Sequence, residues 1–186
     1  MLFQIISLLL EVIAGVIGGA CLLRLYMQHQ RIAMSARSGN PLGRFVFALT
    51  DWLVLPLRRL VPAAGRWDLA SLVATFLVEL AQFSLLWAFT SFGVSYGAVL
   101  VLAAFGVLRL VISGLTGLVI VYAILSWVQS NTVLADVIER LVAPVLAPIR
   151  RFVPLVGGVD LSPLVLLLLL QVAAIVLGHF QGLALQ

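Results

Sequence analysis

The sequence is short of charged residues, which make up 10% of its 186 positions, while hydrophobic residues make up 63%. Soluble globular domains carry about 25% charged residues, so this composition excludes an ordinary soluble protein. Several apolar runs reach the roughly 20 residues that a membrane-crossing helix needs. Few charges and long apolar runs together predict an integral membrane protein.

Lysine is absent and cysteine nearly so. All eleven basic side chains are arginines, and the single cysteine, Cys21, excludes an internal disulfide and a cysteine-rich metal site. The net charge of +4 does not indicate nucleic-acid binding. The arginines lie mostly between the apolar runs, where membrane topology accounts for them.

Catalytic signatures are also missing. The sequence contains no phosphate-cradling glycine loop, no zinc-binding helix and no serine elbow. His29 and His179 are expected on opposite sides of the bilayer and make a poor metal or haem pair. We therefore predict no catalytic residue, no metal and no cofactor, and we do not expect an enzyme.

The first apolar run is expected to be a retained helix. The N-terminus lacks the basic segment and the small-residue cleavage site of a signal peptide. Within the run, Gly15 and Gly19 lie four residues apart on one helix face, a spacing that lets a second helix approach closely. The alternative is that small residues fall there by chance, and the sequence does not decide between the two.

A segment of eighteen residues occurs twice, at 56–73 and at 148–165, with an offset of 92 residues and no gap. Ten of the eighteen positions are identical, and six of those ten are proline, arginine, glycine or aspartate. These types are scarce in this apolar chain, so shared hydrophobicity alone does not explain the match. The repeat predicts that two similar units make one protein.

The shared positions are predicted to form an arginine-bearing turn. The first proline should end the preceding helix, because proline lacks an amide donor and clashes with the preceding turn, and the second should limit the next turn. The glycine permits a reversal with positive φ. Asp68 is a candidate cap for the next span, and Ser162 with Pro163 is a candidate N-cap and first-turn pair. The predicted turn residues are Pro56, Arg58, Arg59, Pro62, Gly65 and Asp68, and Pro148, Arg150, Arg151, Pro154, Gly157 and Asp160.

Each unit is predicted to be a transmembrane helix, an interfacial amphipathic helix, the arginine turn and a second transmembrane helix. The fold class is therefore an all-α membrane protein with two tandem repeats and about four transmembrane helices. The first unit, residues 1–92, has spans at 5–27 and 69–92 and an interfacial helix at 41–55. The second, residues 93–186, has a lead-in at 96–105, spans at 106–127 and 163–180, and an interfacial helix at 133–147.

The interfacial helices are inferred from their length and their two faces. A helix over 41–55 is too short to cross about 30 Å of hydrocarbon at about 1.5 Å per residue. In 133–147, apolar residues form one helical stripe and charged residues occupy the other face. Such helices lie in the plane of the membrane surface. The apolar stripe comprises Val133, Leu134, Val137, Ile138, Leu141, Val142, Val145 and Leu146, and the charged face comprises Asp136, Glu139 and Arg140.

The stretch from Ser95 to Trp127 decides the topology. As one helix it would be about 48 Å long, which exceeds the hydrocarbon thickness of about 30 Å. We favour one span preceded by the lead-in; the alternative is two short tilted helices broken near Gly114 and Gly117. Four spans put both arginine turns on one side, predicted to be cytoplasmic with both termini outside, whereas five would invert the second unit.

Three polar side chains are predicted inside the membrane. Glu79 lies within the second span, and its partner at the repeat offset of 92 is Gln171. The functional interpretation is a proton or cation relay, and the alternative is a hydrogen bond that joins helices. Glu11 lies in the first span and could pair with Arg109.

The arginines of the two turns are the candidate contact residues. Guanidinium groups suit lipid phosphates or an acidic partner, because they donate paired hydrogen bonds. The alternative is plain positive-inside anchoring, and polybasic segments next to membranes serve both roles. Asp68 and Asp160 could simply orient the arginines.

The double motif resembles the YggT family of small bacterial membrane proteins, and the resemblance covers nearly the whole chain. Two departures are Arg66-Trp67 in place of a glycine and an aliphatic residue, and a longer polar loop after Tyr26. The residues that carry the resemblance in the second copy are Ser126-Trp127, Pro144, Pro148-Ile149-Arg150-Arg151 and Gly157-Gly158-Val159-Asp160-Leu161-Ser162-Pro163. Those in the first copy are Leu23-Arg24-Leu25-Tyr26-Met27-Gln28, Asn40-Pro41 and Pro56-Leu57-Arg58-Arg59.

The resemblance implies a bacterial inner-membrane protein, with relatives linked to tolerance of osmotic or potassium stress, to division genes, or in plastids to cytochrome assembly or nucleoid distribution. It supplies no catalytic residues. Our first hypothesis is a non-enzymatic scaffold or assembly factor that presents the arginine turns to anionic lipid or a protein partner. The alternative is an oligomeric ion-transport or stress-tolerance protein that uses Glu79 and Gln171. Expected partners are membrane lipids and other membrane proteins, with a homo-oligomer left open and no nucleic acid.

Overall fold

A computed structural model describes residues 1–35, 39–62, 65, 67–89, 95–128, 132–153 and 160–185. Within these ranges the chain forms six helices, and four of them are long and apolar enough to cross a membrane, namely α1, α3, α4 and α6. The predicted all-α membrane protein with about four spans is confirmed. The helices are α1 (Leu2–His29), α2 (Pro41–Leu60), α3 (Leu69–Phe89), α4 (Tyr96–Trp127), α5 (Val133–Arg150) and α6 (Ser162–Ala184).

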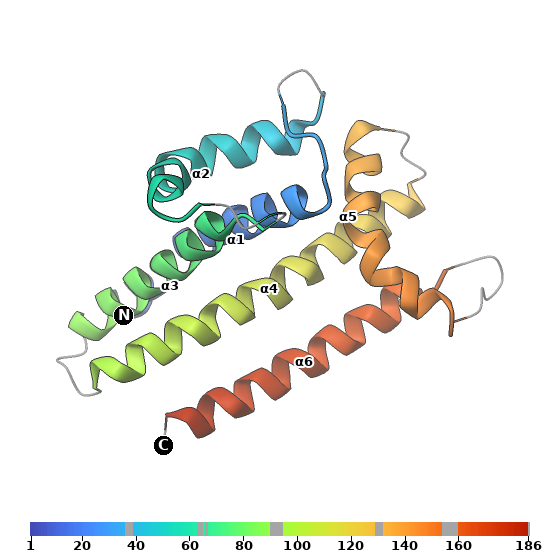
Figure 1. Cartoon of the computed structure of the whole chain (residues 1–186). Helices are drawn as coiled ribbons and strands as arrows, with labels where there is room; N and C mark the ends of the chain where they lie inside the picture. Colours follow the sequence, from blue (N-terminus) through green and yellow to red (C-terminus); the bar gives the residue numbers. More distant parts are fainter. Residues whose placement is uncertain are drawn as a thin grey trace.

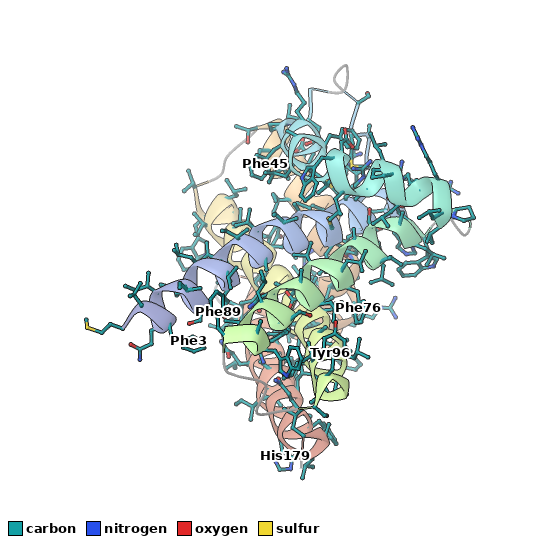
Figure 2. All side chains as sticks on the ribbon, turned by 90° about the vertical axis from the view of Figure 1, so that its left-hand side faces the viewer. Phe3, Phe45, Phe76, Phe89, Tyr96 and His179 are labelled. Atoms are coloured by element: carbon teal, nitrogen blue, oxygen red, sulfur yellow. The ribbon has the colours of Figure 1, made fainter. Side chains whose placement is uncertain are left out.

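The four long helices run along a common direction, as Figure 1 shows. Both chain termini lie at one end of this bundle, and α2 and α5 lie at the other. Neighbouring helices pack in the order α1, α3, α4 and α6, with α1 also touching α4. Figure 2 places Phe45 of α2 and His179 of α6 at opposite ends of the molecule.

Small residues let the long helices approach one another. A β-carbon added at Gly18 would lie 2.7 Å from Leu110 Cδ1, so α1 and α4 meet closely there. The two glycines that sequence analysis singled out, Gly15 and Gly19, have no atom within 4 Å of such a β-carbon. Their spacing therefore marks no close helix approach inside the described chain, and Gly18 provides the close approach instead.

The lead-in at 96–105 is not a separate element, because α4 is one unbroken helix of 32 residues. The alternative break near Gly114 and Gly117 is also wrong. A break there would leave backbone donors and acceptors unsatisfied in hydrocarbon, which costs more than the weak helix propensity of glycine. At about 1.5 Å per residue α4 is about 48 Å long, so it must tilt or extend beyond the hydrocarbon.

Neither Pro56 nor Pro148 ends its helix, which corrects the prediction made for both. Pro56 lies inside α2 and Pro148 inside α5, as does Pro144. A proline removes one backbone hydrogen bond and bends a helix without always stopping it. The ribbon of α2 turns sharply in both views, and α5 also bends in Figure 1. The arginine pairs consequently lie at bent helix ends.

The two shorter helices bury different kinds of face. In α5 the predicted apolar stripe packs against protein: Val137, Ile138, Leu141, Val142 and Leu146 are buried in a core that α1, α4 and α6 complete. The charged face with Asp136, Glu139 and Arg140 is exposed. In α2 the buried residues are Gly43, Val46, Thr50 and Val54, while the aromatic side chains of Phe45 and Trp52 are exposed.

Candidate functional site

The first arginine turn is closed by an ion pair. Arg58, in the last turn of α2, donates from Nη2 to Asp68 Oδ2 at 2.5 Å and from Nε to Oδ1 at 3.4 Å. Ser71 Oγ also donates to Asp68 Oδ2, at 2.7 Å. Asp68 has no exposed side-chain surface, whereas the Arg58 side chain is 35% exposed. The pair fixes the end of α2 against the start of α3.

A second arginine reaches the same turn from α1. Arg24 is 1% exposed, and its Nη1 donates to Thr50 Oγ1 and to Asp51 Oδ1, each at 2.7 Å. Its Nε lies 3.9 Å from Asp68 Oδ2, and its guanidinium stacks on the Phe47 ring at 4.9 Å. Two arginines therefore face two aspartates, so the charges of this cluster balance as its burial requires.

The electrostatics of Asp68 follow from this arrangement. Burial alone would raise the pKa of Asp68, because it disfavours a charged carboxylate. The hydrogen bonds from Arg58 and Ser71, together with the charges of Arg58 and Arg24, outweigh burial and hold the pKa below its usual value. Asp68 is thus a fixed anion at neutral pH and serves as the anchor of the turn.

The second turn repeats the pair. Arg150, the last residue of α5, donates from Nε to Asp160 Oδ2 at 2.9 Å and from Nη2 to the Tyr122 hydroxyl at 2.7 Å. Burial acts to raise the pKa of Asp160, but hydrogen bonds from Ser162 and Arg150 lower it overall. Both side chains are partly exposed, at 39% for Arg150 and 29% for Asp160, so this ion pair is more accessible to solvent than the first.

The predicted capping role of Ser162 is wrong. Leu161 is the N-cap of α6, and Ser162 is the first helical residue. The backbone N–H of Ser162 donates to Asp160 Oδ1 at 2.9 Å, so the aspartate satisfies the donor that a cap would have served. Pro163 follows in the first turn, as predicted.

Sequence reasoning missed the roles of several site residues, of which Arg24 and Tyr122 occupy matching places in the two repeats. Each lies five residues before the last residue of its helix, α1 or α4, and each contacts the ion pair of its own turn. A signal for Arg24 existed, because a charge inside an apolar helix needs a partner. No comparable signal marked Tyr122, since tyrosine is common near membrane interfaces.

The second arginine of each pair is placed differently from the first. Arg59 and Arg151 are both exposed. Within the described part of the chain, no hydrogen bond or ion pair involves either guanidinium. Each turn therefore uses one arginine to hold its own shape and leaves the other exposed, without an ion-pair partner among the described residues.

Both turns lie at the same end of the bundle. Arg24 of α1 binds Asp51 of α2, and two residues later the Tyr26 hydroxyl donates to Leu141 O of α5 at 2.8 Å. The last turns of α1 thus touch both short helices, and Figure 1 shows the two on the side away from the termini. A topology with four membrane spans predicts that both turns lie at the same end of the bundle.

Of the remaining predicted turn residues, Gly65 has φ of +62°, which a reversal requires and glycine adopts without strain. Pro62 is exposed just after α2. Pro154 and Gly157 lie outside the described residues.

The predicted intramembrane polar residues are not brought together. Glu79 is 5% exposed and lies against Gly106 of α4, whereas Gln171 is exposed on α6. Glu11 is exposed on α1 and forms no ion pair with Arg109 within the described ranges. Arg109 Nη2 instead donates to Gln181 Oε1 at 2.6 Å, which joins α4 to α6.

No group of three histidine, cysteine, aspartate or glutamate side chains in the described ranges is arranged to hold a metal ion. His29 stacks on Trp67, with ring centroids 4.3 Å apart, and its Nδ1 is buried without a hydrogen-bond partner among the described residues.

Comparisons with known proteins agree with the motif. The family model described as CCB3/YggT matches residues 1–89 and 101–181, two segments that are consistent with two repeats. A Vibrio alginolyticus protein, "Uncharacterized protein in proC 3'region", is 35% identical over 164 residues, covering 87% of this chain and 86% of the relative. "Uncharacterized protein YggT" of Escherichia coli K12 is 32% identical over 171 residues, covering 90% and 86%. No solved structure matches the chain.

Proposed function

The chain belongs to the CCB3/YggT family of membrane proteins, and from that premise we propose that it is a non-enzymatic scaffold or assembly factor of the bacterial inner membrane. In this proposal both arginine turns face the cytoplasm and contact anionic lipid headgroups or an acidic protein partner. The excess of arginine at one end of the bundle supports the cytoplasmic orientation, because basic residues are retained on that side.

One observation carries the proposal: the arginines of each pair have different surroundings. Arg58 and Arg150 bind aspartates of their own turns, while Arg59 and Arg151 are exposed and unpaired within the described part of the chain. If the arginines served only to set the membrane topology, their positive charge would suffice. One arginine of each pair would then not need to be held in an ion pair. The rigid neighbour fixes the backbone from which the free guanidinium projects.

Anionic lipid is the favoured ligand of the free arginines. A guanidinium binds phosphate through paired hydrogen bonds, and each basic residue near an anionic surface contributes about 1 kcal/mol. Phe45 and Trp52 of α2 are 59% and 63% exposed, as expected for side chains that enter the headgroup region. Their insertion would hold Arg59 at the depth of the phosphates.

Paired double variants test this function. The purified protein is titrated with phosphatidylglycerol or phosphatidylcholine, and bound lipid is counted by native mass spectrometry. Arg59→Gln with Arg151→Gln should abolish the preference for phosphatidylglycerol and leave the thermal unfolding midpoint unchanged. Arg58→Gln with Arg150→Gln should lower the midpoint.

Arg44→Gln provides the control, because Arg44 is also exposed on α2 but lies outside the motif. Equal loss of lipid preference in this variant would show that general charge, and not the turns, attracts the lipid. An undiminished preference in the Arg59 and Arg151 double variant would refute lipid binding by the turns and leave a protein partner as their target.

An ion-transport or osmotic-stress role remains the second candidate, and the burial of Glu79 favours it. A path through both Glu79 and Gln171 would need a second copy of the chain, because Gln171 lies on the exposed surface of α6. A liposome flux assay that compares the wild type with Glu79→Gln tests this role. Flux that is absent from the wild type, or unaltered by the substitution, would count against it.

A further inference from the structure

We propose that Glu79 is a proton-binding site inside the membrane, formed where its carboxyl group lies against Gly106 between α3 and α4. This inference does not depend on lipid binding by the arginine turns. Glu79 is 5% exposed and lies ten residues into α3, so its side chain is at hydrocarbon depth.

The carboxyl group occupies a space that only glycine leaves open. A β-carbon at position 106 would collide with Glu79 Oε2, and would also lie 2.9 Å from Glu79 Cδ and 3.1 Å from Phe83 Cε2. One turn away, Thr75 Oγ1 already donates to Ser71 O at 3.0 Å, so its proton is not available to the carboxylate. The site therefore fits a carboxyl group closely, and no hydrogen bond to that group is found among the described residues.

A countercharge in direct contact with Glu79 is also missing from the described part of the chain. Among the described residues, no ion pair within 4.0 Å involves Glu79. The charged groups that act on it are Arg109 of α4 and Glu11 of α1, and Arg109 already donates to Gln181 of α6. A bare carboxylate in hydrocarbon is costly unless it is paired, so the carboxyl group of Glu79 is expected to carry a proton.

An apolar carbodiimide tests this assignment on the wild-type protein. Such a reagent takes the carboxyl proton onto one nitrogen while the carboxylate oxygen bonds to its central carbon, so a protonated acid in apolar surroundings reacts. The protein in lipid nanodiscs is treated with dicyclohexylcarbodiimide at pH 7, digested, and mapped by mass spectrometry. We expect the adduct on Glu79 and its progressive loss as the reaction pH is raised.

The exposed carboxylates provide the controls. Glu139 lies on the charged face of α5, so Glu139→Gln should leave the Glu79 adduct unchanged, and Glu79→Gln should remove it. Arg109→Gln should retain it, because Arg109 donates to Gln181 and not to Glu79.

Two results would overturn the proposal. One is a wild-type protein whose Glu79 peptide carries no adduct even when the reaction pH is lowered, which would mean that no protonated carboxyl group is present there. The other is protection of Glu79 by potassium or sodium, but not choline, at constant pH. That result would assign the site to an alkali cation in place of a proton.

Discussion

Arg58 and Asp68 lie ten residues apart and form a bidentate ion pair at the turn between α2 and α3 in the first repeat, with the aspartate side chain wholly buried. The same spacing joins Arg150 to Asp160 in the second repeat. Two copies of one motif thus produce two copies of one contact. The aspartate is more deeply buried in the first copy than in the second, so we expect the loss of each ion pair to lower the free energy of unfolding by a different amount.

Asp68→Asn should destabilise the chain far more than Asp160→Asn. Removing the buried anion leaves Arg58 without its charge partner and takes one of two carboxylates from the buried Arg24, and breaking a buried pair costs about 3–5 kcal/mol. The second pair is partly exposed and should cost about 1 kcal/mol or less. Thermal or chemical unfolding of both variants in the same detergent measures the difference, and equal losses would contradict the claim that the buried first pair stabilises the fold more than the second.

Acid should weaken both turns. The pKa of Asp68 and that of Asp160 are lower in the folded chain than their usual values, so the unfolded chain binds protons first as pH falls. Their stabilisation is complete above the unfolded pKa of about 3.9 and is lost as pH falls through the lower folded values. The thermal midpoint should therefore drop below about pH 4. An Asp68→Asn, Asp160→Asn double variant should show a shallower drop, and an identical pH profile would disprove the link.

Tyr122→Phe should destabilise the second turn modestly. The substitution removes the hydroxyl that accepts a hydrogen bond from Arg150 and keeps the ring beneath the guanidinium. The expected loss is about 1 kcal/mol, with the first turn unaffected. Tyr96→Phe is the matched control, because Tyr96 lies at the opposite end of α4. A midpoint lowered equally by both changes would argue against a specific role for the Tyr122 hydroxyl.

Trp52 should enter the lipid headgroup region. Its ring is 63% exposed on α2, and its Nε1 already donates to Leu49 O at 2.8 Å, so the side chain can enter an apolar layer without an unpaired donor. A variant that keeps Trp52 as its single tryptophan should be quenched by lipids brominated near the glycerol backbone. Quenching by aqueous iodide alone would place α2 away from the bilayer.

Features of the fold that depend on local sequence could be predicted, and features that depend on tertiary packing could not. The spans and the repeat could be predicted, because apolar runs of membrane length and the shared Pro, Arg, Gly and Asp positions are local signals. The ends of α2 and α5 could not, because whether a proline stops or bends a helix depends on what packs around it.

The arginine turns were predictable only in part, again because local signals can be found in a sequence and tertiary contacts cannot. The motif alone indicates that Asp68 and Asp160 could orient the arginines. Three features depend on tertiary packing and could not be predicted from a repeat offset in the sequence. They are the contact of Arg24 with the first turn, the hydrogen bond to the Tyr122 hydroxyl, and the unequal burial of Glu79 and Gln171.

The placement of both arginine turns on one side of the membrane is the claim on which the account rests. It can be measured in a Cys21→Ala background that carries a single new cysteine, either Arg59→Cys or Arg151→Cys. A membrane-impermeant maleimide is applied to intact spheroplasts and to inverted vesicles. The account predicts that both cysteines react in inverted vesicles and that neither reacts in spheroplasts. Labelling of the two cysteines from opposite sides would contradict it.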